Sequence, residues 1–270
     1  MINSNIRVQY PPIAKYIGCF YGQQVKRREV DWSFLSICRN LFSEPDCPKQ
    51  AMDTECGLIV FDLDGTLVET RDDLARSVNH ALGESGLPRH PVEVVVQFVG
   101  DGARKLVERS VGPGKKGVIY DEVLDAFLSH YIEHCTDRCT LYPGVAKVLE
   151  SLAPLPLCVL TNKPLGPTER ILQALGLAPH FQSVIGGDSH FGRKPDPAGL
   201  LHLIKAAGAA PESSLLVGDT RVDVLTAREA RCLCAGVRYG FRPDDFMDCP
   251  PDYLIESMED LPAILQQAPG

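Results

Sequence analysis

From Gly57 onward the chain alternates between short hydrophobic runs and apolar positions at helical spacing. The first run, Leu58–Phe61, is typical of a strand buried on both faces. Later strands are predicted at Leu157–Leu160, Ser183–Ile185, Leu215–Val217, Cys232–Val237 and Tyr253–Ile255. Because helical stripes separate these runs, the pattern predicts an α/β fold: a Rossmann-like, doubly wound parallel sheet with helices on both faces.

One long interruption breaks this alternation after the first strand. Thr70 is a predicted helix N-cap, and apolar positions repeat at helical spacing over residues 74–82. Two further helices are predicted near Val92–Val99 and over about Asp121–Cys135. No comparable strand pattern occurs in this stretch. Residues 70–140 are therefore expected to form a helical cap domain, inserted into a core of residues 53–69 and 141–270.

Residues 1–52 lack the strand–helix alternation. A basic cluster, Lys26–Arg28, precedes apolar residues between Trp32 and Phe42 that fall near helical spacing. One interpretation is a docking or targeting helix. The interpretation we favour is an N-terminal extension outside the fold, disordered or not native, with translation beginning at Met52.

The composition restricts the partners and the compartment. The net charge of -8 argues against nucleic acid and against an anionic membrane as partners. No apolar run approaches the roughly 18 residues that a membrane span needs. The 10 cysteines include no Cys-x-x-Cys pair, so we expect reduced thiols and a cytoplasmic protein. The sequence leaves the oligomeric state open between monomer and dimer.

One cluster of soft ligands needs a separate interpretation. His130, His134, Cys135 and Cys139 follow one another at helical spacing. A zinc site is one interpretation of this cluster. We favour ordinary helix positions, because no paired ligand loops accompany them.

Four polar clusters follow predicted strands. They are Asp62-Leu63-Asp64-Gly65-Thr66, Thr161-Asn162-Lys163, Lys194-Pro195-Asp196-Pro197, and Gly218-Asp219-Thr220 with Asp223. Each cluster alone is compatible with an ordinary turn or helix cap. Their joint occurrence is informative because folds of this class bind ligands outside the carboxyl ends of the strands.

The carboxylates of these clusters would repel one another if they met at one point. Two like charges 4 Å apart cost about 4 kcal/mol at an effective dielectric near 20. Magnesium would neutralise them, because it prefers hard oxygen ligands and keeps room for waters and a phosphate. Lys194 would supply a second positive charge.

The segment from Phe61 to Val68 resembles the first motif of the haloacid dehalogenase-like hydrolases, and the other three clusters resemble its second, third and fourth motifs in order. Further stretches resemble bacterial phosphoglycolate phosphatases: Asp73-Leu74-Ala75, Val99-Gly100-Asp101-Gly102-Ala103, Tyr142-Pro143-Gly144-Val145 and Gly186-Gly187-Asp188. The resemblance runs from about Leu58 to about Phe241. It implies a magnesium-dependent phosphomonoester hydrolase whose substrate is a small anionic phosphate ester, with 2-phosphoglycolate the leading candidate.

The same resemblance implies a role for each core residue. Asp62 is the nucleophile that forms an aspartyl-phosphate, and Asp64 is the general acid and then the general base. The metal ligands are the carboxylates of Asp62 and Asp219 and the backbone carbonyl of Asp64. Asp223 does not bind the metal directly; it positions a metal-bound water or Lys194. The residues implied to bind the phosphate oxygens are Thr161, Asn162 and Lys194.

The helical insert resembles a cap that closes over the site and contacts the substrate. Gly100 and Gly102 would permit a bend, and Arg104 would pair with a substrate carboxylate. The competing interpretation makes Arg104 a solvated residue at the start of a surface helix. An exposed Arg104 that is turned from the crevice would remove its support for phosphoglycolate.

Other functions use a similar site. A sugar-phosphate phosphatase or a phosphomutase would use the same residues on another substrate. A phospho-acceptor signalling module also needs an acidic magnesium site and a nearby lysine. Asp64 and the bulky cap argue against that module, because a signalling phosphoaspartate has to persist. A dehalogenase is disfavoured because it needs neither Asp64 nor a metal site.

Overall fold

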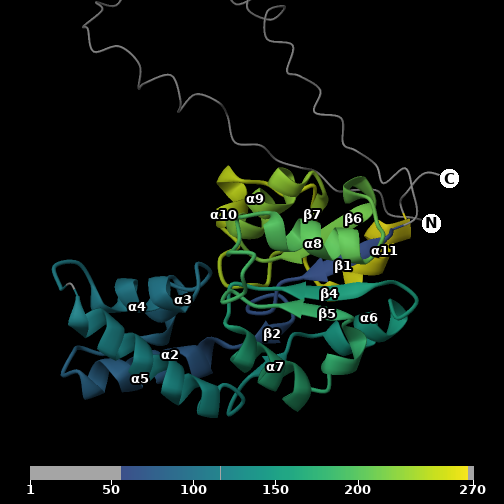
Figure 1. Cartoon of the computed structure of the whole chain (residues 1–270). Helices are drawn as coiled ribbons and strands as arrows, with labels where there is room; N and C mark the ends of the chain where they lie inside the picture. Colours follow the sequence, from purple (N-terminus) through teal and green to yellow (C-terminus); the bar gives the residue numbers. More distant parts are fainter. Residues whose placement is uncertain (1–55, 116, 267–270) are drawn as a thin grey trace, which may run out of the picture. The chain divides into compact units, whose positions relative to one another are not determined.

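The computed structural model describes residues 56–115 and 117–266, which fall within one compact unit, Lys49–Gly270. The predicted N-terminal extension, residues 1–52, lies outside the described residues. In the described part, strands and helices alternate as the sequence predicts, and the predicted helical insert follows the first strand. Figure 1 shows this insert beside the sheet and its flanking helices.

A six-stranded parallel sheet forms the core. Its strands in spatial order are β5 (Ser183–Ile185), β4 (Leu157–Leu160), β1 (Leu58–Phe61), β6 (Ser214–Gly218), β7 (Leu233–Val237) and β8 (Tyr253–Ile255). The chain runs outward from β1 through β4 to β5, and then returns to β6 on the other side of β1. The winding therefore reverses beside β1, where folds of this class leave a crevice for ligands. The predicted doubly wound α/β fold is confirmed.

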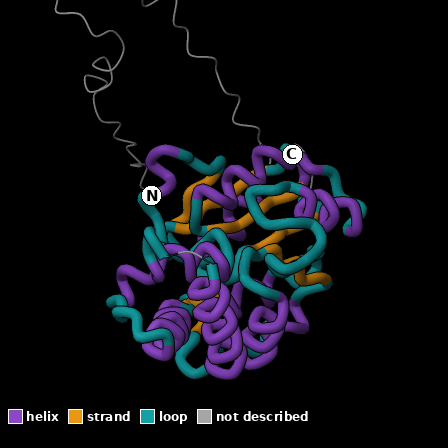
Figure 2. The backbone as a smooth tube through the Cα atoms, turned by 60° about the vertical axis from the view of Figure 1, so that its left-hand side comes forward, coloured by secondary structure: helices purple, strands orange, loops and turns teal. Residues whose placement is uncertain are grey.

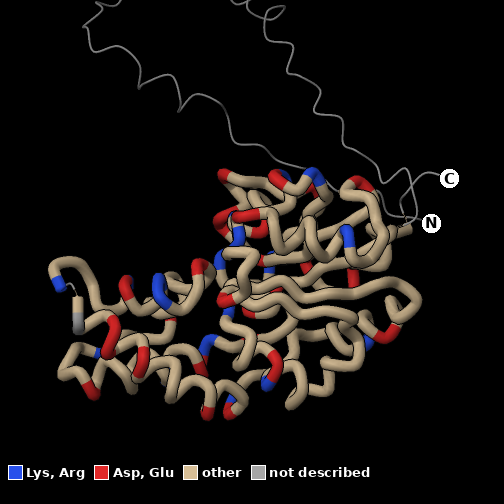
Figure 3. Tube along the Cα trace, in the orientation of Figure 1, with Lys and Arg blue, Asp and Glu red and all other residues tan. Residues whose placement is uncertain are grey.

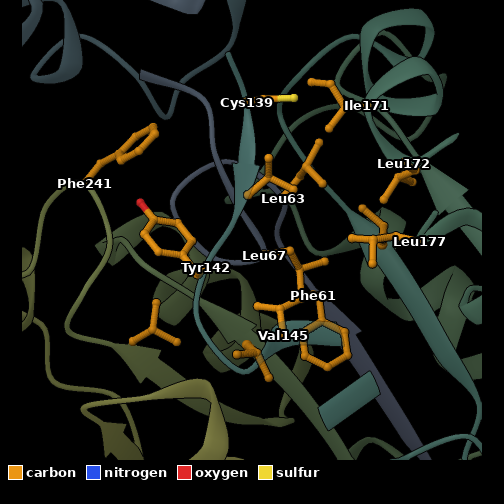
Figure 4. Packing of buried hydrophobic residues seen from close by; sticks show 14 of the residues in the cluster. Phe61, Leu63, Leu67, Cys139, Tyr142, Val145, Ile171, Leu172, Leu177 and Phe241 are labelled. Carbon is orange, nitrogen blue, oxygen red and sulfur yellow. The ribbon is translucent and has the colours of Figure 1, made fainter. Parts of the chain in front are cut away.

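Helices cover both faces of the sheet (Figure 2). The core helices are α6 (Val145–Ser151), α7 (Leu165–Ala174), α8 (Ala198–Ala206), α9 (Arg221–Ala230), α10 (Asp245–Asp248) and α11 (Leu261–Gln266), with the 3-10 helices η2 (Ala178–His180), η3 (Pro211–Ser213) and η4 (Met258–Asp260). Ile59 and Phe61 of β1 pack in one hydrophobic cluster with α6 and α7; Figure 4 shows part of it. Leu58 and Val60 pack in a second cluster with α8 and α9. Burial on both faces explains why the strands read as continuous hydrophobic runs.

The insert is built from helices. They are α2 (Arg71–Glu84), α3 (Val92–Val96), α4 (Ala103–Val111) and α5 (Val118–His134). The helices α2 and α5 pack along each other, with α3 against α2 and α4 against both. The helix expected after Thr70 is confirmed, and the one expected from about residue 121 begins three residues earlier. The helix expected over Val92–Val99 ends at Val96, because the chain then turns toward Gly100, whose φ is 123°.

Helix α4 and two short strands are not predicted by the hydrophobic pattern. Helix α4 buries only Leu106, Val107 and Ser110, while its other positions are largely charged, so its apolar stripe is short. Strands β2 (Val68–Glu69) and β3 (Thr140–Leu141) pair antiparallel, but two residues are too few for a period. This ribbon holds the two chain crossings between core and insert side by side.

Candidate active site

Two carboxylates meet where the winding of the sheet reverses. Strand β1 ends at Phe61 and its neighbour β6 ends at Gly218, so Asp62 and Asp219 leave adjacent strands at the same edge. One carboxylate oxygen from each of Asp62, Asp219 and Asp223 lies within 4.8 Å of the other two. Within residues 56–115 and 117–266, no other three His, Cys, Asp or Glu side chains converge in this way.

Lys194 lies between these carboxylates. Its Nζ is 2.6 Å from Asp223 Oδ1 and 3.0 Å from Asp62 Oδ2, and its side chain is 2% exposed. The other oxygen of Asp223 accepts hydrogen bonds from the backbone N–H and the hydroxyl of Thr220, at 3.1 and 2.9 Å. Asp223 therefore caps α9 and also holds Lys194 against Asp62.

Burial and mutual repulsion make the negative charges of this group costly. Burial is the largest cause that raises the pKa of Asp62 to about 6; Lys194 opposes the rise, and Asp223 and Asp64 add to it. Burial, followed by Asp62 and Asp223, holds the pKa of Asp219 well above its ordinary range. Burial lowers the pKa of Lys194, but its two carboxylate partners outweigh this and raise it overall. If all three carboxyl groups ionise, the group therefore carries more negative charge than one lysine balances.

The acidic group fits a hard divalent cation. Asp62 and Asp219 offer carboxylate oxygens, which magnesium prefers. The backbone N–H of Phe241 donates to Asp219 Oδ2 at 2.8 Å and fixes its orientation. A Cβ added to Gly65 or Gly240 would overlap the Asp219 side chain, so only glycine permits these close approaches. Fixed oxygen ligands and unbalanced negative charge are the two properties that a magnesium site requires.

Asp64 is held by two polar neighbours. Thr70 Oγ1 donates to Asp64 Oδ1 at 2.6 Å, and Lys163 Nζ lies 2.7 and 2.8 Å from the two carboxylate oxygens. Residues of both signs gather at this junction of core and insert (Figure 3). The sequence motifs imply no role for Lys163. The signal that marks it is its place, beside Thr161 and Asn162, in the polar cluster that directly follows β4.

The second polar cluster divides into two roles. Thr161 lines the cavity described below, and its Oγ1 accepts a hydrogen bond from Lys163 N at 3.3 Å. Asn162 Nδ2 donates to the carbonyls of Gly100 and Lys194, at 2.8 and 2.9 Å, and its Oδ1 accepts from Lys194 N at 2.8 Å. Both amide donors are used, so Asn162 joins the insert to the Lys194 loop instead of offering a free donor to a phosphate.

A cavity of about 50 Å³ lies between the strand ends and the insert. Gly100 and Gly102 line it, as the resemblance implies for the cap. The insert also contributes the largely apolar side chains of Leu106, Phe127 and Tyr131. The insert therefore covers the crevice and separates much of it from water.

Arg104 does not reach this cavity. Its side chain is 52% exposed, and its guanidinium pairs with Asp121 of α5 at 3.1 Å. Its position in the first turn of α4 matches the competing interpretation, a solvated residue at a helix start. The expected pairing of Arg104 with a substrate carboxylate has no support in this geometry.

Of the soft-ligand cluster, only His130 and His134 lie on α5, as expected; Cys135 is the C-cap of this helix and Cys139 follows in the loop before β3. The rings of His130 and His134 stack 4.2 Å apart, and the buried Cys135 and Cys139 do not converge with them on one point. The seven described cysteines are all free thiols. None of the described helices has the length and apolar character needed to cross a membrane.

Comparison with known proteins agrees with this geometry. The sheet, its strand-end aspartates and the covering helices define the architecture of a cap-bearing α/β hydrolase. Residues 59–237 match the model of the haloacid dehalogenase-like hydrolases, and the chain belongs to this family.

Several relatives have a narrower name. The phosphoglycolate phosphatase of Haemophilus influenzae is 37% identical over 224 residues, covering 79% of this chain and 100% of the relative. Phosphoglycolate phosphatase 1 of Pseudomonas aeruginosa is 38% identical over 220 residues, covering 78% and 80%. The crystal structure of a predicted phosphoglycolate phosphatase from Haemophilus somnus has a TM-score of 0.73 at 31% identity, covering 78% and 98%.

Proposed function

We propose that this protein is a magnesium-dependent phosphatase that forms an aspartyl-phosphate on Asp62 and acts on a small anionic ester, with 2-phosphoglycolate the leading candidate. The observation that carries the proposal is the convergence of Asp62 and Asp219 in a buried, electron-rich crevice under the insert. The names of the relatives support the substrate.

The reaction has two displacements at phosphorus. In the first, an oxygen of the Asp62 carboxylate attacks phosphorus while the bond to the leaving oxygen breaks, and Asp64 gives that oxygen its proton. In the second, water attacks the same phosphorus, Asp64 takes the proton of the water, and the bond to Asp62 breaks. Inorganic phosphate leaves, and both carboxyl groups return to their starting forms.

Magnesium would be held by the carboxylates of Asp62 and Asp219 and by the backbone carbonyl of Asp64. When bound, it supplies positive charge that shields the phosphate from the anionic nucleophile and spreads the negative charge of the transition state. Asp223 keeps Lys194 beside Asp62, where the ammonium balances part of the negative charge of the nucleophile.

Of the remaining polar residues, Thr161 is proposed to bind the phosphate and Asn162 to hold the insert against the core. Thr161 lines the cavity and offers its hydroxyl to a non-bridging phosphate oxygen. Asn162 acts indirectly, because its amide ties Gly100 of the insert to the loop that carries Lys194. The small cavity favours a compact leaving group. We place the enzyme in the cytoplasm, in keeping with its free thiols.

A phosphate-release assay tests the proposal. Purified protein with magnesium should hydrolyse 2-phosphoglycolate in preference to sugar phosphates. Removing magnesium with a chelator, or changing Asp62→Asn, should lower turnover by at least about 10³-fold, since the nucleophile acts as a unit with its partners.

Asp72→Asn is the matched control, because this exposed aspartate of α2 lies outside the site, and it should keep full activity. Full activity in Asp62→Asn would remove the proposed nucleophile. A preference for sugar phosphates would support the phosphatase activity but contradict 2-phosphoglycolate as its substrate.

A further inference from the structure

The cavity holds one feature that the family motifs leave unassigned. Its described lining includes the carboxylates of Asp62, Asp64 and Asp219, and a single positively charged side chain, Lys163. Lys194 is absent from this lining and is occupied by its own carboxylate partners. A negatively charged group on the leaving side of a substrate therefore meets one cation in this cavity.

Lys163 is fixed with one donor to spare. Its side chain is 2% exposed, and Nζ contacts both oxygens of Asp64 at 2.7 and 2.8 Å. An ammonium carries three N–H donors, so these two contacts leave one. The same Nζ lies 4.7 Å from the ring centroid of Tyr131, a residue of α5 in the insert.

Tyr131 indicates a ligand-binding site independently of Lys163. The residue is 1% exposed and lines the cavity, yet its hydroxyl has no hydrogen-bond partner among the described residues. A buried hydroxyl without a partner is costly, and a ligand that accepts its hydrogen bond relieves that cost. Burial holds the pKa of Tyr131 well above its ordinary range, so the hydroxyl remains a donor.

We propose that Lys163 and Tyr131 form a subsite, shared between core and insert, that binds the carboxylate of the substrate's leaving group. This inference rests on the proposed function and assigns to Lys163 the role that Arg104 does not fill. The carboxylate takes the third donor of Lys163 and the hydroxyl of Tyr131, while Lys163 keeps its contact with Asp64.

The subsite selects a chemical class. A substrate whose carboxylate is one carbon from the ester oxygen places an anion beside the general acid, where only a paired cation makes burial favourable. A neutral leaving group gives the Lys163 ammonium no negative charge to pair with, and a hydroxyl offers Tyr131 only a neutral, weaker acceptor. The apolar walls from Leu106 and Phe127 offer a neutral polar substituent no compensation.

Two esters of matched size test the subsite: 2-phosphoglycolate, which has the carboxylate, and 2-hydroxyethyl phosphate, which lacks it. The measured quantity is the ratio of their kcat/KM values. We expect a ratio of about 10 to 100 for the unchanged protein, the effect of one or two hydrogen bonds to a charged group. Lys163→Met should bring the ratio close to one, although both absolute rates fall because Asp64 also loses its partner.

Controls separate the subsite from general damage. Lys147→Met removes a lysine whose side chain is 81% exposed and should leave both rates unchanged. Tyr131→Phe removes one oxygen, should lower the ratio about threefold, and carries the test if Lys163→Met does not fold. In the Asp62→Asn background, calorimetry should show weaker binding of 2-phosphoglycolate, but not of 2-hydroxyethyl phosphate, when Lys163 is replaced.

The failures are distinguishable. If folded Lys163→Met and Tyr131→Phe variants keep the ratio of the unchanged protein, the subsite is overturned. If the unchanged protein hydrolyses both esters equally, the subsite is overturned while the phosphatase stands. If it hydrolyses neither ester with magnesium, the proposed function itself fails.

Discussion

Asp73 shows how one buried carboxylate fixes a long-range contact. Asp73 lies in the first turn of α2, where an acidic side chain interacts favourably with the positive end of the helix dipole. This is the role that the local sequence indicates for it. In the structure it is 1% exposed, and its Oδ2 accepts hydrogen bonds at 2.9 Å from the backbone N–H groups of Arg138 and Cys139. The carboxylate thus ties the start of the insert to the segment that leads back to the core.

Removing this carboxylate should destabilise the protein. Asp73→Ala leaves two N–H groups without their acceptor, so we expect the free energy of unfolding to fall by about 2 to 4 kcal/mol. The matched change Asp72→Ala, at an exposed neighbour 3.9 Å from Arg138, should cost less than about 0.5 kcal/mol. Denaturant unfolding of both variants measures the difference, and equal losses would show that Asp73 has no special role.

At the scale of elements, α4 begins at a glycine that lies against the core. Glycines with positive φ flank it, Gly102 at 88° and Gly112 at 82°. A Cβ added to Gly102 would lie 3.1 Å from Arg193 Nε and 3.2 Å from the carbonyl oxygen of Asn162, whereas a Cβ on Gly112 would meet nothing within 4 Å. The two glycines therefore share a backbone requirement but differ in their surroundings.

Substituting each of these two glycines distinguishes the effect of backbone strain on stability from the effect of insert closure on catalysis. Both Gly102→Ala and Gly112→Ala should lower the free energy of unfolding by about 1 to 3 kcal/mol, the cost of a backbone conformation that essentially only glycine adopts. Only Gly102→Ala should also lower kcat/KM, by about tenfold, because the new methyl group pushes the insert away from Asn162. Steady-state kinetics and thermal unfolding of the two variants decide this, and equal kinetic effects would contradict the closure argument.

At the scale of the molecule, the sequence predicted those features of the fold and the site that follow from local residue patterns. The strand runs and the polar residues after them predicted the sheet and the meeting of Asp62 with Asp219, because carboxyl ends of parallel strands share one edge. The ribbon of β2 and β3 was not predictable, since two residues form no period.

The cap side of the site depends on contacts that no local pattern contains. Lys163 and Tyr131 are 32 residues apart in the sequence and meet only when α5 packs over the strand end. Arg104 was an attractive candidate by charge and position, but its helix start turns it toward Asp121. A charge pattern indicates which residues are available, and the packing of the insert determines which of them face the cavity.

Asp62 is proposed to carry the phosphoryl group during turnover. The direct measurement is an acid quench during turnover of 2-phosphoglycolate with magnesium, reduction of the trapped acyl phosphate with borohydride, and peptide mapping of the product. We expect residue 62, and no other aspartate, to be converted to homoserine, and we expect no such product from Asp62→Asn. Homoserine at Asp64, Asp219 or any other aspartate, with residue 62 unchanged, would contradict it.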